Sequence, residues 1–233
     1  MGKDRFVLVT GASGGLGEVI SRRLNEEGYS VIALVRKAPS KTPTYWSNVL
    51  EADFLDLESV EKATTEVCSI APLGLHALVN CAGLAYHSGV RELIGDEVYK
   101  TFMVNSVSPI MMVGRLIPYL KKRNGILVMV TSRLVSGNLP FTSSYSASKK
   151  AIDSFACSVR IETGLRVLCV EPGAIETEFL SRTHNKQAVS HFCNRQITRL
   201  RPERVAKMIV NAIQADPTEL VERIQIVPSE QIF

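Results

Sequence analysis

The sequence predicts an α/β fold, a doubly wound sheet of seven parallel strands with helices on both faces. Short, unbroken apolar runs rich in β-branched residues recur along the chain, as is typical of strands buried on both faces. Segments with helical periodicity lie between them, and this alternation favours right-handed crossovers and a parallel sheet. The length of 233 residues fits one domain, residues 1–233.

The strands are predicted at the apolar runs 6–10, 30–35, 48–54, 76–81, 125–132, 166–171 and 223–227. The helices are predicted at 17–27, 58–70, 95–104, 106–123, 145–162 and 202–215, and glycine or proline follows several of them, as is typical of helix ends. The segment 177–201 interrupts this alternation because it is long, polar and irregular. We therefore expect a flexible substrate lid there rather than a core element.

Composition limits the class of protein. Hydrophobic residues make up 45% and charged residues 21% of the chain, which argues against disorder and against a coiled coil. The net charge of +4 gives no nucleic-acid or membrane signature, so neither is expected as a partner. The five cysteines form no CxxC pair and complete no metal site with histidine, so we expect free thiols and no metal. No signal peptide and no membrane-length apolar stretch is recognisable, which favours a cytoplasmic protein.

A glycine-rich turn follows the first strand and opens the first helix. Residues 10–17 read TGASGGLG, so Gly11, Gly15 and Gly17 keep side chains away where backbone must approach a pyrophosphate. The helix N-terminus directs its free N–H groups at the same negative charge. A plain tight turn is the alternative, since the GxxxGxG spacing differs from the commoner GxGxxG.

This turn resembles that of the short-chain dehydrogenase/reductase family, and the resemblance extends through most of the chain. Residues 80–83 (NCAG) resemble the NNAG of the family, with Cys81 in place of the second asparagine, and residues 172–177 (PGAIET) resemble its PGxIxT. The resemblance implies a single-domain Rossmann fold. The cofactor-binding residues that we predict are Gly11, Ser13, Gly14, Gly15, Leu16, Gly17, Arg36, Lys37, Asp53, Phe54, Asn80, Ala82, Gly83, Tyr145, Lys149, Pro172, Gly173, Ile175 and Thr177.

The end of the second strand predicts NADP(H) rather than NAD(H). Val35 stands where an acidic residue would bind the ribose hydroxyls of NAD. The next residues, Arg36 and Lys37, are cations that can reach a 2′-phosphate. The alternative is a solvated pair of charges at a strand exit. By resemblance, Asp53 is expected at the adenine amino group, with Phe54 beside it.

A second group of residues predicts proton transfer to a carbonyl. Tyr145 and Lys149 stand four residues apart in a predicted helix, where side chains at this spacing are neighbours. Reducing a ketone requires an acid for the developing alkoxide, and Lys149 is expected to tune Tyr145 by favouring its phenolate. Ser132, at the end of the fifth strand, can donate to the carbonyl oxygen. The resemblance implies that Asn105 orders a water and passes protons to the lysine.

Together these residues predict an NADPH-dependent carbonyl reductase that acts on a small molecule. An NADP-binding regulatory or scaffold protein without turnover and an NAD-dependent alcohol dehydrogenase are the alternatives. The resemblance implies a homodimer through the helices 106–123 and 145–162, and a homotetramer is the further possibility. The lid segment and the residues just after it contain six basic residues, which either attract an anionic substrate or keep a mobile loop solvated: Arg182, Lys186, Arg195, Arg199, Arg201 and Arg204. Three apolar residues of the segment could line a pocket or pack the lid: Phe179, Leu180 and Phe192.

Overall fold

The computed structural model describes residues 5–177, 183–194 and 198–230, and it confirms the predicted α/β architecture. Seven parallel strands form one sheet in the order β3-β2-β1-β4-β5-β6-β7. The strands are β1 Phe6–Thr10, β2 Ser30–Val35, β3 Asn48–Glu51, β4 Ala77–Asn80, β5 Ile126–Val130, β6 Arg166–Pro172 and β7 Arg223–Ile226. They follow the predicted runs, although β3 ends earlier than predicted.

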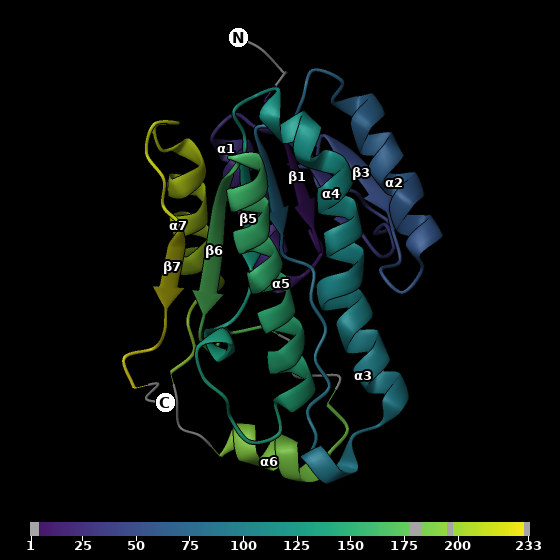
Figure 1. Cartoon of the computed structure of the whole chain (residues 1–233), viewed down its shortest axis with the longest axis vertical. Helices are drawn as coiled ribbons and strands as arrows, with labels where there is room; N and C mark the ends of the chain where they lie inside the picture. Colours follow the sequence, from purple (N-terminus) through teal and green to yellow (C-terminus); the bar gives the residue numbers. More distant parts are fainter. Residues whose placement is uncertain (1–4, 178–182, 195–197, 231–233) are drawn as a thin grey trace.

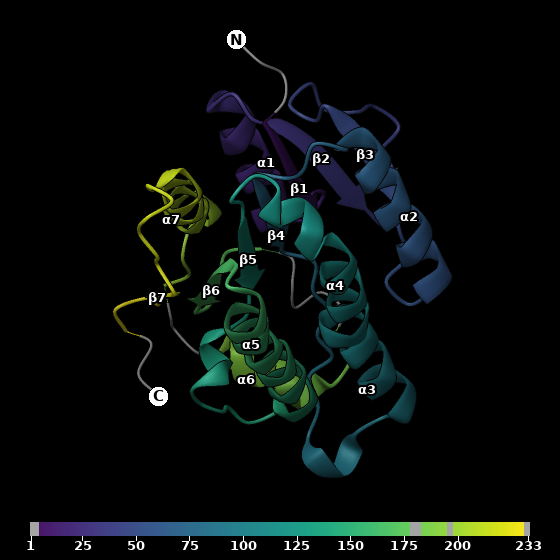
Figure 2. The same ribbon diagram turned by 45° about the horizontal axis from the view of Figure 1, so that its top comes forward.

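Helices cover both faces of this sheet (Figure 1). The α-helices of the described residues are α1 Gly15–Glu26, α2 Leu57–Ile70, α3 Gly95–Phe102, α4 Ser108–Lys121, α5 Ser143–Thr163, α6 Lys186–Cys193 and α7 Pro202–Gln214. Figure 2 shows α1 and α7 on one side of the sheet and α2, α4 and α5 on the other. None of these helices has both the length and the apolar character that a membrane span requires within the described part of the chain.

The alternation of side chains along each strand builds a separate core on each face. In β1, Val7 and Val9 pack in the cluster that α1 and α7 complete, whereas Leu8 packs in the cluster of α2, α4 and α5. All three are fully buried, and burying a side chain of this size contributes about 1.5–3 kcal/mol. Burial on both faces explains why the strands read as unbroken apolar runs.

Two segments differ from the sequence prediction. The predicted lid segment 177–201 contains a helix that the sequence pattern did not indicate, because residues 186–193 form α6, which begins where the side chain of Asn185 accepts a hydrogen bond from the N–H of Ala188 at 2.9 Å. A helix this short gives too few periodic positions to be recognised among polar residues. Between α3 and α4, a π-helical turn, Met103–Val107, replaces the predicted break.

Strand order reverses beside β1, which lies between β2 and β4. Ligands of doubly wound sheets bind at such a point, outside the carboxyl ends of the strands. Here Thr10, the last residue of β1, holds the two strand ends together. Its hydroxyl donates to Oδ1 of Asn80 at 3.0 Å and accepts from the backbone N–H groups of Cys81 and Ala82, both at 3.1 Å.

Candidate active site

A cavity of 960 Å³ lies along the carboxyl edge of the sheet and brings most of the predicted site residues together. Residues that follow β1, β2, β3, β4, β5 and β6 line it, with others from α1 and α5. The predicted residues in its lining are Gly11, Ser13, Gly14, Gly15, Leu16, Gly17, Arg36, Asp53, Phe54, Ala82, Gly83, Ser132, Tyr145, Lys149, Pro172, Gly173, Ile175 and Thr177. Lys37, Asn80 and Asn105 do not line it.

The glycine-rich turn is packed so closely that side chains have no room at three positions. Gly11 has a φ of +64°, and a Cβ there would lie 2.8 Å from the Cα of Ala82. A Cβ on Gly15 would lie 2.9 Å from Cγ2 of Thr177, and one on Gly17 would overlap the carbonyl oxygen of Gly11. The turn therefore joins β1, the segment after β4 and the segment after β6 at one edge of the cavity.

The N-terminus of α1 lies at this edge without a side-chain cap. Its N-cap residue is Gly14, which has no side chain to cap the helix. The N–H groups of the first turn are therefore available to bind an anion. Together with the glycines, this arrangement fits a pyrophosphate, whose oxygens need backbone donors and no intervening side chain.

Tyr145 lies in the first turns of α5, with only 8% of its surface exposed. Burial raises the pKa of Tyr145 to about 12, and a side-chain hydrogen bond with Ser132 acts in the opposite direction. Ser132 lies at the end of the same cavity, where its Oγ also accepts the N–H of Leu134 at 3.2 Å. The two hydroxyl groups therefore meet over the cavity, and Tyr145 keeps its proton near neutral pH.

Lys149 is 3% exposed, and its ammonium group donates to the carbonyl oxygen of Val130 at 2.9 Å. The nitrogen lies 6.0 Å from the centre of the Tyr145 ring. Burial lowers the pKa of Lys149 from 10.5 to about 8, and Cys81 partly offsets this. Burial is the largest cause of the raised pKa of Tyr145.

Asn105 is fully buried in the π-helical turn between α3 and α4. Its Oδ1 accepts the N–H of Leu84 at 2.8 Å, and its Nδ2 donates to the carbonyl oxygen of Leu84 at 2.8 Å and to Oγ of Ser148 at 2.9 Å. The side chain thus holds the backbone after β4 and does not face the cavity. The predicted relay would have to run through the backbone of this turn.

The end of β2 presents two exposed cations, of which Arg36 lines the cavity and Lys37 does not. The nearby carboxylate of Glu51 accepts a hydrogen bond from the N–H of Ala38 at 2.8 Å. Asp53 lines the cavity, and its carboxylate accepts the N–H of Leu55 at 3.0 Å.

Sequence reasoning missed an aromatic cluster on the other side of the cavity. His87, in the loop after β4, is 5% exposed, lines the cavity and lies with its ring centre 5.9 Å from that of Tyr145. The ring of Phe192, from α6, lies 4.8 Å from that of His87 and also lines the cavity. Only Phe192 carried a sequence signal, as an apolar residue in the lid segment.

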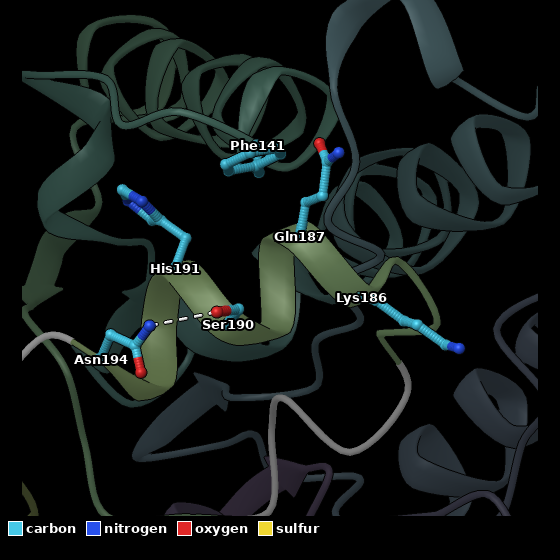
Figure 3. A pocket seen from close by; sticks show the side chains of 6 residues that line it. All are labelled: Phe141, Lys186, Gln187, Ser190, His191 and Asn194. Atoms are coloured by element: carbon cyan, nitrogen blue, oxygen red, sulfur yellow. Dashed lines mark hydrogen bonds between the residues drawn. The ribbon is translucent and has the colours of Figure 1, made fainter.

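A second hollow, of 640 Å³, lies between α6 and Phe141 (Figure 3). In this view Gln187 and His191 extend from the side of α6 that faces Phe141, whereas Lys186 points away from it. The ring centres of His191 and Phe141 lie 5.4 Å apart. Among the other residues of the predicted lid, Arg199 lines the larger cavity. Four of them lie outside the described residues: Phe179, Leu180, Arg182 and Arg195.

Known proteins resemble this chain in sequence and in fold. The short chain dehydrogenase family matches residues 5–215. Protein FixR of Bradyrhizobium diazoefficiens is 30% identical over 223 residues, which cover 89% of this chain and 80% of FixR. Retinol dehydrogenase 16 of Rattus norvegicus is 32% identical over 76% of this chain, and the match spans 58% of that protein.

A solved alcohol dehydrogenase from the archaeon Thermococcus sibiricus, complexed with 5-hydroxy-NADP, has a TM-score of 0.84 to this chain at 23% identity. The match covers 98% of each chain, and it shows the fold.

Proposed function

The chain belongs to the short-chain dehydrogenase family of oxidoreductases, and on that premise we propose that it is an NADPH-dependent enzyme that reduces a ketone or aldehyde to an alcohol. One observation carries this proposal: a single cavity joins an uncapped, glycine-walled helix N-terminus to the hydroxyl groups of Ser132 and Tyr145. The first feature fits a dinucleotide and the second fits a carbonyl oxygen.

The residues that would hold the cofactor follow its length along the cavity. Backbone N–H groups of the turn around Gly15 would bind the pyrophosphate, and Asp53 and Phe54 would lie at the adenine. The segment from Pro172 to Thr177 would hold the carboxamide end. Arg36 would bind the 2′-phosphate of NADP through charge-assisted hydrogen bonds. The relative from Thermococcus sibiricus, which has the same fold, was solved with an NADP derivative.

In the proposed mechanism, the protein's residues bind the substrate oxygen and supply its proton. When bound in this cavity, NADPH would supply the hydride for the carbonyl carbon. Ser132 donates a hydrogen bond to the carbonyl oxygen as negative charge develops there. Tyr145 gives its proton to that oxygen, and its high pKa favours this direction because the phenol is protonated near neutral pH.

Lys149 would then assist the return of the proton. Because burial lowers its pKa to about 8, its ammonium group exchanges protons easily near neutral pH. Its ammonium group, 6.0 Å from the centre of the Tyr145 ring, would also bind a ribose hydroxyl of the cofactor. The relay that the resemblance assigns to Asn105 would run through the backbone of the π-helical turn, because the side chain is engaged by Leu84 and Ser148.

The alternatives predict different measurements. An NADP-binding scaffold would bind the cofactor without turnover, and an NAD-dependent alcohol dehydrogenase would prefer NAD⁺ and an alcohol. Purified protein is assayed by NADPH absorbance on neutral ketones, keto acids, sugars and acyl thioesters, with NADH in parallel. We expect turnover with NADPH and a loss of kcat/KM of about 10²- to 10⁴-fold in Tyr145→Phe. A Tyr145→Phe variant as fast as the wild type would refute the mechanism.

Two further parts of the proposal concern the lid and the oligomer. If Arg199 attracts an anionic substrate, Arg199→Gln should raise KM for keto acids more than for neutral ketones.

Exposed apolar residues on α4 and α5, among them Met111 and Ile161, support a homodimer through these helices. Light scattering would show a monomer if this assembly is wrong.

A further inference from the structure

His87 is a buried histidine that lines the cavity and has no part in the proposed mechanism. Its ring meets the ring of Tyr145 edge to face, with an interplanar angle of 68° and centres 5.9 Å apart. The residue lies in the loop that follows β4 and lines the same cavity as Tyr145. It is therefore placed to contact the substrate next to its reacting carbonyl.

One backbone contact fixes the tautomer of His87. Nδ1 lies 3.3 Å from the carbonyl oxygen of Phe141, and because a carbonyl oxygen can only accept a hydrogen bond, Nδ1 carries the proton. Burial lowers the pKa of His87 to about 4, so the ring is neutral near pH 7. In this tautomer Nε2 is left with a lone pair and accepts hydrogen bonds.

The backbone of Phe141 adopts an unusual conformation to make this contact. Its φ is +67°, a left-handed value that bulky residues rarely adopt. The same carbonyl oxygen accepts the N–H of Ser88 at 3.2 Å, so it holds the His87 loop at two adjacent residues. Strained backbone of this kind persists where the surroundings hold it in place, and it gathers at functional sites.

The acceptor nitrogen of His87 is open to the cavity. Among the described residues, Nε2 of His87 has no hydrogen-bond partner. It is also not fully buried, in contrast to Nε2 of His191, which is buried and unpaired. Phe192 packs on the ring at 4.8 Å between centres and keeps it in place. The ring thus presents one fixed hydrogen-bond acceptor beside Tyr145.

We propose that His87 determines substrate specificity by accepting, at Nε2, a hydrogen bond from a hydroxyl group next to the carbonyl that is reduced. The preferred substrates are then α-hydroxy ketones and α-hydroxy aldehydes, and vicinal diols in the reverse direction. A lone pair cannot bind a carbonyl or ether oxygen, because these groups are acceptors as well. This inference rests on the proposed reductase function and names the substrate class of the same site.

The test compares three ketones that differ at one position: 1-hydroxy-2-butanone, 1-methoxy-2-butanone and 2-butanone. With NADPH and wild-type protein, kcat/KM should be about tenfold higher for the hydroxy ketone than for the other two, as one net hydrogen bond allows. In His87→Phe, which keeps the ring contacts but has no nitrogen, this preference should disappear. His87→Gln, whose side-chain oxygen is an acceptor, should retain part of it.

The ratio of two substrates in one sample does not depend on how much protein is folded, so a purely structural role of His87 would leave it unchanged. His76→Phe is the matched control, because His76 does not line the cavity, and it should keep the wild-type ratio. Equal rates for the hydroxy ketone and 2-butanone in the wild type, or a preference that survives in His87→Phe, would overturn the role of His87. Reduction of other carbonyl compounds would in that case leave the proposed function standing, whereas no turnover of any carbonyl compound would contradict both.

Discussion

The side chain of Asn105 pairs with both backbone polar groups of Leu84, accepting its N–H and donating to its carbonyl oxygen, each at 2.8 Å. This reciprocal contact fixes the chain where it leaves β4 and enters the cavity wall. The segment that it holds leads from Gly83 to His87.

Asn105→Ala should therefore destabilise the protein. It leaves the N–H and carbonyl groups of Leu84 buried without partners, and each such group costs about 1–3 kcal/mol. We expect the free energy of unfolding in urea to fall by at least ~2 kcal/mol. Asn25→Ala, at an exposed position of α1, is the control and should change it by less than about 0.5 kcal/mol. Equal stability of the two variants would show that the pairing is unimportant.

Lys149 should lower the stability of the protein at neutral pH. Burial reduces its pKa from 10.5 to about 8, so the unfolded chain binds the proton more tightly than the folded protein does. At ~1.4 kcal/mol per pKa unit, this difference lowers the free energy of unfolding by ~3 kcal/mol below pH 8.

Lys149→Met, which removes the charge, should thus be more stable than the wild type near pH 7, although inactive. The difference should shrink as the pH rises from about 8 to 10.5 and the folded wild type loses its proton before the unfolded chain does. Unfolding experiments at several pH values without cofactor measure this. A difference that grows over this range would show the opposite sign of shift.

Arg36→Ala should reduce affinity for NADPH and leave that for NADH nearly unchanged. A charge-assisted hydrogen bond contributes about 1.5–3 kcal/mol, which corresponds to roughly 10- to 100-fold in Kd. Isothermal titration calorimetry with both cofactors measures the effect, and Lys41→Ala, an exposed cation outside the cavity, is the control. Equal affinity of the wild type for the two cofactors would refute the preference for NADP.

Two glycine-to-alanine substitutions should have opposite effects. A Cβ on Gly17 would overlap the carbonyl oxygen of Gly11, so Gly17→Ala should destabilise the fold by about 1–3 kcal/mol and weaken NADPH binding. Gly114 lies inside α4 with open space around it, so Gly114→Ala should stabilise by about 0.5–1 kcal/mol. Thermal unfolding and cofactor titration of both variants test this. Tight NADPH binding by Gly17→Ala would contradict the role of the glycine turn.

Features set by neighbouring residues could be predicted from the sequence. The strands follow from short apolar runs, and the packed turn follows from the spacing of Gly11, Gly15 and Gly17, because these patterns are local. The closeness of Tyr145 and Lys149 follows from their positions in one helix, but the pKa of each depends on burial, which spacing does not reveal.

Features that join distant segments could not be predicted. His87 lies in a loop without periodicity, and its partners, Phe141 and Phe192, come from other parts of the chain. In the sequence, Asn105 is recognisable only by its resemblance to a family motif. Nothing in the sequence indicates that its side chain forms hydrogen bonds with the backbone of Leu84. The helix α6 was missed because its eight residues give too few periodic positions.

The π-helical turn Met103–Val107 makes this part of the chain sensitive to changes in length. Such a turn contains one residue more than the α-helix that would replace it, and each residue of an α-helix turns the chain by about 100°. A one-residue deletion here would remove the extra residue and close the turn as regular α-helix, which would turn Asn105 relative to Leu84 and break their pairing. The same deletion within the exposed residues 39–42 would shorten a surface connection only. Related chains should therefore vary in length at that loop while keeping the register between α3 and α4.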